Sequence, residues 1–201
     1  FGLQSGASEI VAVEVNPASV DLVREYADYN GDLYGQPTVR VEVDEGRSVL
    51  LRENRDYDLI FLSQVITSTA ERSGYVLSEN TIYTVEAFSD YLDHLRPGGQ
   101  IALKLYDEPT LTRALSVAVA ALNERGLSDA EAMRRIEIFA DPGAEPPVPL
   151  LVINAAAISH NAALADGAVA VEVGFEPLFL PQVLSSAPFD AIEAGTMTFD
   201  D

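Results

Sequence analysis

The sequence predicts an α/β protein with a doubly wound, mostly parallel sheet and an antiparallel hairpin at one edge. Short apolar runs rich in β-branched residues alternate with segments of helical periodicity over residues 9–125, an alternation typical of parallel sheets with crossover helices. The runs are nearly continuous in apolar residues, as strands buried on both faces are. Two later runs are joined by a short proline-rich turn, which favours antiparallel pairing.

The amino-terminal elements follow this alternation. Residues 9–15 (EIVAVEV) form a β-branched run that ends at Asn16-Pro17, and proline suits the first turn of a following helix. Residues 57–62 (YDLIFL) are a strongly apolar run and predict the third strand. Between these runs we expect a helix at 18–30, a second strand at 39–43 and a short helix at 47–53.

Start and stop signals predict the remaining elements. An amphipathic pattern at 84–95 ends at Arg96-Pro97-Gly98-Gly99, a run that stops a helix. A helix at 109–125 closes at Gly126, because glycine commonly lies just past a helix end. We also expect a fourth strand at 100–106, a hairpin of strands 135–140 and 148–155, and a last helix at 159–171.

Length and charge restrict the function. The 201 residues have room for one domain, which we assign to residues 1–175, followed by a tail at 176–201. Asp and Glu number 32 against 12 Lys and Arg. Such a surface repels phosphate backbones, so nucleic acid is not an expected partner. A cationic ligand such as a polyamine is one explanation of the charge, and general solubility or a salt-adapted surface is the other.

The composition excludes several kinds of site. The sequence has no Cys and two His, so we predict no disulfide and no metal site, and assign His94 and His160 structural roles. No run of about 18 uncharged apolar residues occurs, so we expect no membrane span. The absence of cysteine suits a reducing cytoplasm, where we expect the protein. The chain opens with Phe1, which favours an internal fragment of a longer protein.

Acidic residues follow the first two predicted strands. Glu14 ends the first strand, where a carboxylate can accept hydrogen bonds from both hydroxyls of a ribose. Asp44, Glu45 and Gly46 follow the second strand, where a carboxylate can bind an adenine amino group and glycine lets the backbone approach closely. Ligands of doubly wound sheets bind outside the carboxyl ends of the strands. We therefore predict a nucleoside site at this edge.

The third strand is followed by a long polar stretch. Ser63 and Gln64 end the strand, and the stretch continues to Glu79. Connections of this length are often functional. We expect Ser63 and Gln64 to lie where a reacting group would be placed, with Tyr75 and Glu79 facing the acceptor substrate.

Five stretches of the sequence resemble a known family. They are Glu9–Pro17 (EIVAVEVNP), Asp44–Leu50 (DEGRSVL), Tyr57–Leu62 (YDLIFL), Leu77–Phe88 (LSENTIYTVEAF) and Arg96–Gly99 (RPGG). Together they resemble class I S-adenosylmethionine (SAM)-dependent methyltransferase folds and, within them, spermidine synthase-like domains of larger, often membrane-anchored bacterial proteins. The resemblance covers about residues 6–106 and implies a Rossmann-like methyltransferase sheet.

The resemblance also implies roles for individual residues. Glu14 corresponds to the acid that binds the ribose of the cofactor. Glu45, directly before Gly46, resembles the acid that contacts adenine, with Asp44 as the alternative if the register shifts by one. The implied cofactor is SAM or decarboxylated SAM. Spermidine synthases have an aspartate where this chain has Ser63. A neutral hydroxyl is no general base near pH 7, which argues against classical aminopropyl transfer.

A second departure concerns the start of the sheet. In these folds a central first strand and a glycine-rich turn precede the strand that ends in the ribose-binding acid. Only 13 residues precede Glu14, so we expect the sheet to lack that strand. Strands 10–15 and 57–62 would then pair directly, or recruit a second copy through their exposed edges to form a homodimer.

Two hypotheses follow for the function. The first is a spermidine synthase-like or SAM-dependent transferase domain, whose activity belongs to the intact parent protein and whose acceptor is a polyamine or another nucleophile. The second is a non-catalytic ligand-sensing or scaffold domain of a larger membrane-associated protein. Ser63 in place of the aspartate favours the second hypothesis, and the pair Glu14 and Glu45 favours a bound ligand in either.

Overall fold

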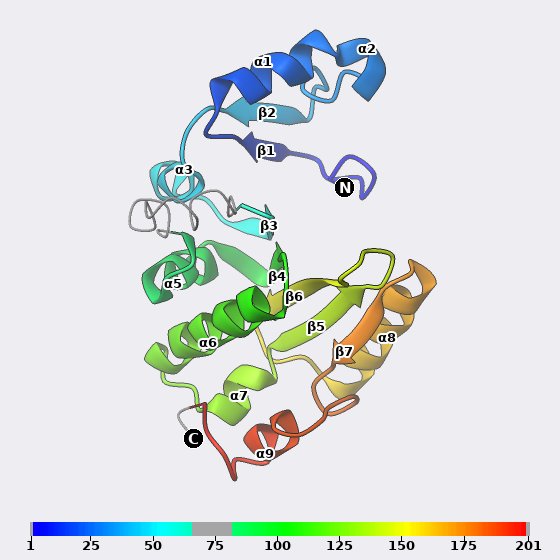
Figure 1. The fold of residues 1–201 in the computed structure, drawn as a ribbon. Helices are drawn as coiled ribbons and strands as arrows, with labels where there is room; N and C mark the ends of the chain where they lie inside the picture. The colour runs from blue at the N-terminus through cyan, green and yellow to red at the C-terminus, as the bar shows by residue number, and fades with distance from the viewer. Residues whose placement is uncertain (1, 66–81, 200–201) are drawn as a thin grey trace. The chain divides into compact units, whose positions relative to one another are not determined.

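The computed structural model describes residues 2–65 and 82–199. The chain divides into two compact units, Phe1–Arg55 and Asp56–Asp201. Each unit has its own sheet (Figure 1).

The first unit has a two-stranded parallel sheet with three helices. Strand β1 (Ile10–Val13) pairs with β2 (Val39–Glu42). Asn16 begins α1 (Pro17–Glu25) by accepting a hydrogen bond from the Ala18 amide. The helix expected at 18–30 is divided in two, because Tyr26 leaves the helical conformation before α2 (Ala27–Asn30). Helix α3 (Gly46–Glu53) follows β2 and buries Val49 and Leu50.

The second unit has a five-stranded sheet in the order β3-β4-β6-β5-β7. Strand β3 pairs in parallel with β4, whereas the β4–β6, β6–β5 and β5–β7 pairs are antiparallel. The strands are β3 (Tyr57–Ser63), β4 (Leu95–Lys104), β5 (Ile136–Asp141), β6 (Val148–Asn154) and β7 (Glu176–Phe179). The predicted hairpin is thus the β5–β6 pair.

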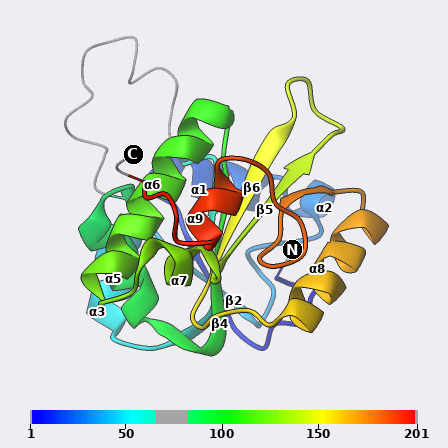
Figure 2. The same cartoon turned by 90° about the horizontal axis from the view of Figure 1, so that it is seen from below.

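Helices cover both faces of this sheet, as the view in Figure 2 shows. Ile101, Leu103 and Ile153 are fully buried. On the opposite face Phe139 and Val152 pack with Ala163 of α8. The helices are α5 (Val85–Asp93), α6 (Glu108–Glu124), α7 (Asp129–Met133), α8 (His160–Glu172) and the short α9 (Phe189–Glu193). Helices α5, α6 and α7 lie on one side of the sheet and α8 on the other.

A backbone bulge marks the start of β4. Tyr57 pairs with Leu95 but Leu59 pairs with Gln100, so the four residues 96–99 of β4 lie opposite the single residue Asp58 of β3. A Cβ atom at Gly99 would lie 2.9 Å from the carbonyl oxygen of Tyr57, closer than a side chain tolerates. The glycine therefore permits the close contact between the two strands.

The predicted fold class is confirmed, and the structure has three further elements. Strand β7 and helix α9 lie in the stretch 176–201, for which the sequence predicted no element. The short helix α7 was also not predicted. Strand β1 pairs with β2 in the first unit, and β3 pairs with β4 in the second; direct pairing of the strands at 10–15 and 57–62 stays a prediction. The other strands and helices follow one another in the order that the apolar runs predict.

One carboxyl group lies within the apolar interior of the second unit. Glu137 of β5 is 2 % exposed. Its Oε2 accepts a hydrogen bond of 3.3 Å from Asn154, whereas Oε1 has no partner among the described residues. Burial, and then the negative charge of Asp166 on α8, raise the pKa of Glu137 to about 7. A proton on Glu137 supplies the donor that this pair of acids otherwise lacks.

We predict that Glu137→Gln makes stability less dependent on pH. The folded protein holds the proton on Glu137 more tightly than the unfolded chain, so stability falls as pH rises from about 4.5 through about 7. The neutral amide removes this loss, and the variant should be more stable than wild type at about pH 8, by about 1–2 kcal/mol after screening by solvent.

Thermal unfolding of both proteins at about pH 5 and about pH 8 measures this effect. Glu176→Gln, which changes an exposed acid on β7, is the matched control and should leave the profile unchanged. An identical pH profile for wild type and Glu137→Gln would contradict the assignment.

Candidate functional site

The acidic residues predicted to bind a nucleoside lie at one edge of the first unit. Strands β1 and β2 are parallel, and the amide of Glu14 continues their pairing by donating to the carbonyl of Glu42 at 3.0 Å. Asp44, Glu45 and Gly46 follow β2 directly. The structure therefore places all four predicted cofactor residues at the carboxyl end of this sheet.

Glu14 and Glu45 also organise the local backbone. Oε1 of Glu14 accepts a hydrogen bond of 2.9 Å from the Asn16 amide at the start of α1. The Glu45 carboxylate caps α3, because its two oxygens accept from the amides of Arg47 at 2.9 Å and Ser48 at 2.8 Å. This capping role was not predicted from the sequence. Carboxylate oxygens have further lone pairs, so each can still accept a hydrogen bond from a ligand.

Asp44 is held by an arginine of the following helix. Oδ2 of Asp44 accepts from Arg52 at 2.5 Å, and Oδ1 accepts from the Glu45 amide at 2.8 Å. The hydrogen bond from Arg52, and then that from the Glu45 amide, lower the pKa of Asp44 below its ordinary value. Asp44 is therefore an ionised hydrogen-bond acceptor at neutral pH.

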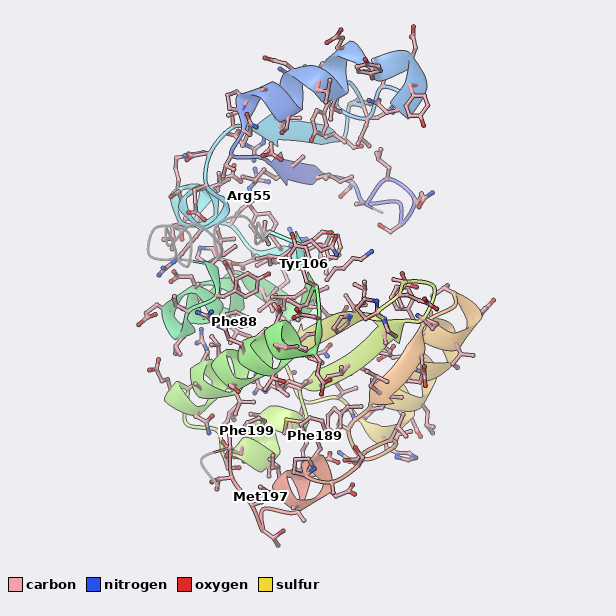
Figure 3. The ribbon with its side chains drawn as sticks, viewed as in Figure 1. Arg55, Phe88, Tyr106, Phe189, Met197 and Phe199 are labelled. Carbon is pink, nitrogen blue, oxygen red and sulfur yellow. The ribbon has the colours of Figure 1, made fainter. Side chains whose placement is uncertain are left out.

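Arg52 belongs to a series of ion pairs that we call the ion-pair chain. Arg52 contacts Asp44 and Glu42, Arg40 contacts Glu42 and Glu53, and Arg55 (labelled in Figure 3) contacts Glu53 and Glu9. The ion-pair chain connects Glu9, the residue before β1, with residues of β2 and α3. Single exposed pairs contribute little to stability, about 0–1 kcal/mol each, so its main effect is to orient the acids at the strand ends. Its members are Glu9, Arg40, Glu42, Asp44, Arg52, Glu53 and Arg55.

We predict that Arg52→Met raises the pKa of Asp44 toward the ordinary value of an aspartate. Methionine keeps the length of the side chain but removes the charge and the hydrogen bond that favour the ionised acid. Titration of the Asp44 carboxyl carbon by NMR measures the shift. Arg24→Met, at the exposed end of α1, is the control, and an Asp44 pKa that is equal in all three proteins would contradict the assignment.

The residues predicted to face the reacting group lie at the carboxyl edge of the second unit. Ser63 ends β3 and pairs with Lys104, the only lysine in the sequence, at the end of β4. The amide of Gln64 donates to the carbonyl of Lys104 at 2.9 Å. The Tyr106 hydroxyl donates to the carbonyl of Gln64 at 2.5 Å (Figure 3). Gln64 has a φ of 49°, a left-handed conformation that this hydrogen bond helps to hold.

Two titratable groups near this edge have shifted pKa values. Ser63 is a neutral hydroxyl. Burial, and then neighbouring Tyr106, raise the pKa of Tyr83 to about 12. Asp107 caps α6, and its hydrogen bonds with Thr110 lower its pKa, so it is a weak base. The expectation that Ser63 stands in place of a general base stays a prediction.

We predict that Tyr106→Phe weakens the start of the segment that follows β3. The variant loses the hydrogen bond to Gln64 and leaves that carbonyl to solvent, at a cost of about 1 kcal/mol. Chemical denaturation measures the loss, and hydrogen exchange of the Gln64 amide should become faster. Tyr29→Phe, at a side chain that is 91 % exposed, should change neither; equal effects of the two substitutions would contradict the prediction.

The sequence missed some residues at these edges, and two predicted residues are outside the described structure. Tyr75 and Glu79 lie in the segment 66–81, outside the described residues. Lys104 and Tyr106 were not predicted, although the rule that pointed to Ser63 also applies to the end of the parallel neighbour β4. Glu14 and Glu45 belong to the first unit, and Ser63 and Tyr106 to the second.

Two further properties of the described residues bear on the kind of site. No group of three or more His, Asp or Glu side chains that could hold a metal ion occurs in residues 2–65 and 82–199. In the same part of the chain, no helix has the length and apolar character needed to cross a membrane.

Comparison with known proteins identifies the class of fold. No family model matches the sequence, and no curated protein matches it significantly. Among solved structures, human methyltransferase-like protein 13 in complex with SAH superimposes with a TM-score of 0.55 and 18% identity, covering 83% of this chain and 70% of that one. The chain therefore has the fold of the class I SAM-dependent methyltransferases.

Spermidine synthases have the same arrangement. A probable spermidine synthase from Corynebacterium glutamicum ATCC 13032 matches with a TM-score of 0.59 and 19% identity over 88% of this chain. Spermidine synthase from Thermotoga maritima matches with a TM-score of 0.55 and 11% identity over 94% of this chain. The matches cover 60% and 61% of those two proteins. The likeness to spermidine synthases expected from the sequence is thus confirmed for the fold.

Proposed function

We propose that this chain is the nucleoside-binding part of a spermidine synthase-like or SAM-dependent transferase. The observation that supports this proposal is the placement of Glu14, Asp44 and Glu45 at the carboxyl end of β1 and β2 in a chain with the methyltransferase fold. Glu14 would accept hydrogen bonds from the ribose hydroxyls, and Asp44 or Glu45 from the adenine amino group. The cofactor would be SAM or decarboxylated SAM.

The residues at this edge fit such a ligand. Oε1 of Glu14 accepts a hydrogen bond from the Asn16 amide, and this contact orients the carboxylate. The second carboxylate oxygen can then accept hydrogen bonds from the hydroxyls of a ligand. A Cβ atom at Gly46 would have no neighbour within 4 Å, so the space above the start of α3 is open to a flat ring. Arg52 keeps Asp44 ionised, and an ionised acid is the better acceptor for an amino group.

The bound cofactor would supply an electrophilic carbon attached to a sulfonium. The chain would contribute mainly position and orientation, which can account for much of the rate of such a transfer. Ser63 and Gln64 would face the acceptor, with Tyr75 and Glu79 beside them. Tyr106 would position the backbone of Gln64. A polyamine is one candidate acceptor, because the chain has a formal net charge of −20 and would attract a cation.

A second candidate function is a domain that binds the nucleoside without catalysis. The observation that favours it is the neutral hydroxyl of Ser63 at the end of β3, near Tyr83, whose pKa burial raises to about 12, and Asp107, whose pKa is lowered by its hydrogen bonds with Thr110. Such a domain would sense a ligand or act as a scaffold in a larger, membrane-associated protein. A cytoplasmic location belongs to both proposals. Both proposals also include a homodimer formed through the edges of β1 and β3. Each of these strands pairs with one other strand among the described residues, so its second edge could pair with another copy.

We predict that Glu14→Gln weakens binding of the cofactor by at least about tenfold, the usual effect of removing a charged hydrogen-bond acceptor. Calorimetric titration of SAM, decarboxylated SAM and methylthioadenosine into wild type and variant measures the change. Glu25→Gln removes one charge from an exposed position at the end of α1 and should bind as wild type does.

The outcomes separate the two functions. Equal affinities of wild type and Glu14→Gln would remove Glu14 from the site, and no binding of any of the three compounds to wild type would contradict both proposals. Binding together with transfer to a polyamine or another acceptor supports a transferase. Binding without turnover across a panel of acceptors supports the sensing domain.

A further inference from the structure

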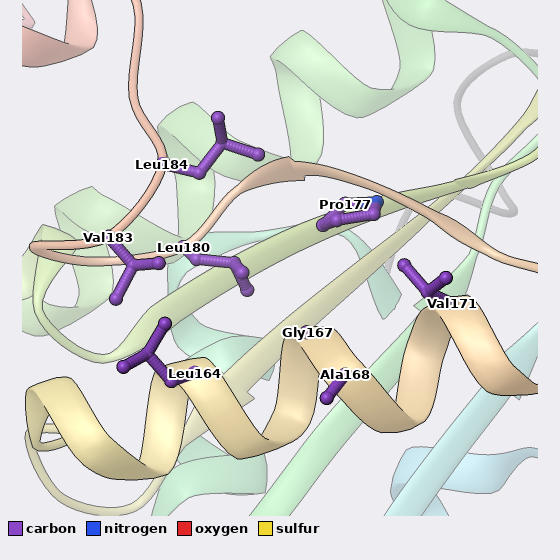
Figure 4. A pocket seen from close by; sticks show the side chains of 8 residues that line it. All are labelled: Leu164, Gly167, Ala168, Val171, Pro177, Leu180, Val183 and Leu184. Carbon is purple, nitrogen blue, oxygen red and sulfur yellow. The ribbon is translucent and has the colours of Figure 1, made fainter.

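A groove with apolar walls lies between α8 and the segment that follows β7 (Figure 4). Its volume is about 580 Å³. Leu164 and Val171 line it from α8, and Leu184 lines it from the opposite side. These three side chains are 48%, 61% and 39% exposed. The groove is therefore an open apolar surface.

A glycine determines the depth of this groove. A Cβ atom at Gly167 would lie 2.6 Å from Cδ1 of Leu180, and Leu180 is 3% exposed. Glycine inside a helix costs about 1 kcal/mol relative to alanine. At this position it lets Leu180 reach the surface of α8 and form the floor of the groove.

The sequence that forms the groove is acidic, although burial raises the pKa of Glu193 and Arg134 lies close enough to lower that pKa in part. Residues 136–201 contain ten Asp and Glu but no Lys or Arg. At one end, exposed Glu172 and Glu176 directly adjoin the lining residues Val171 and Pro177. At the other end, the carboxylate of Glu193 accepts a hydrogen bond of 3.2 Å from the amide of Gln182, next to lining residue Val183. Carboxylates thus lie at both ends of an apolar surface.

An apolar groove with carboxylates at both ends restricts which kind of partner can bind there. A second copy of the chain would bring an equally acidic face against this one, and an anionic membrane surface would be repelled in the same way. A helix with an apolar face and flanking Lys or Arg residues would fill the groove and pair with the acids at its ends. Helix α8 has 13 residues and is about 20 Å long, which matches about three to four turns of a partner helix.

We propose that the groove between α8 and residues 177–184 is a docking site for a basic amphipathic helix of a partner protein. The partner's apolar residues occupy the surface formed by Leu164, Val171 and Leu184. Its basic residues contact Glu172, Glu176 and Glu193. The proposal concerns the second unit alone and does not depend on cofactor binding.

The test uses a fluorescein-labelled peptide of about 18 residues, with leucine on one helical face and lysine on the other. Two comparison peptides keep the composition but scramble the pattern, or replace lysine by glutamate. Fluorescence anisotropy with the full chain should detect binding of the first peptide only, weakening at least about tenfold between about 50 and about 300 mM NaCl.

A matched pair of variants locates the binding. Val171→Lys puts a charge into the groove, whereas Val169→Lys makes the same change on α8 at a residue that is 58% exposed and does not line the groove. We expect Val171→Lys to weaken binding at least about tenfold and Val169→Lys to change it less than about threefold. Circular dichroism melting of both variants verifies that each is folded.

Three outcomes would overturn the proposal. The first is equal weakening by both variants, which would show general attraction to an acidic protein. The second is equal binding of the scrambled peptide. The third is concentration-dependent dimerisation in sedimentation experiments that Val171→Lys abolishes and Val169→Lys does not, which would assign the groove to a second copy.

Discussion

Strand β4 is the element on which the second unit depends. It pairs in parallel with β3 and antiparallel with β6, and its residues Ile101 and Leu103 are fully buried. A shift of one residue in its register would turn these side chains to the opposite face. It would also move Lys104 away from Ser63. The same hydrogen-bond ladder therefore fixes both the core and the residues at the carboxyl edge, and the bulge at 96–99 adjusts the strand where it begins.

The two units hold their strand ends in different ways. In the second unit, an apolar core on both faces of the sheet fixes the strands, and few charged contacts are needed. The first unit has a small sheet with little buried surface, and its acids are oriented by the ion-pair chain and by the caps of α1 and α3. Electrostatic orientation of this kind weakens with added salt. The geometry of the carboxyl edge of the first unit is therefore more sensitive to ionic conditions than that of the second unit.

Most of the secondary structure could be predicted because apolar periodicity and stop signals are local. The run 57–62 and the hairpin at 135–155 were recognised from such patterns, and so was the position of Glu14 after its strand. Strand β7 was missed because a four-residue run beginning Glu176-Pro177 has no local strand signal and forms only by pairing with β5. The capping role of Glu45 and the hydrogen bond from Tyr106 to Gln64 depend on tertiary geometry, which spacing in the sequence does not determine.

The position of Lys104 has a practical consequence. It is the only lysine of the chain, it makes no ion pair with any described residue, and it lies opposite Ser63 at the end of β4. An amine-directed acylating reagent therefore has a single side-chain target in the whole sequence. A fluorophore or spin label attached to the Lys104 side chain would be located at the carboxyl edge of the second unit without any substitution, and its rate of attachment there would report how accessible that edge is.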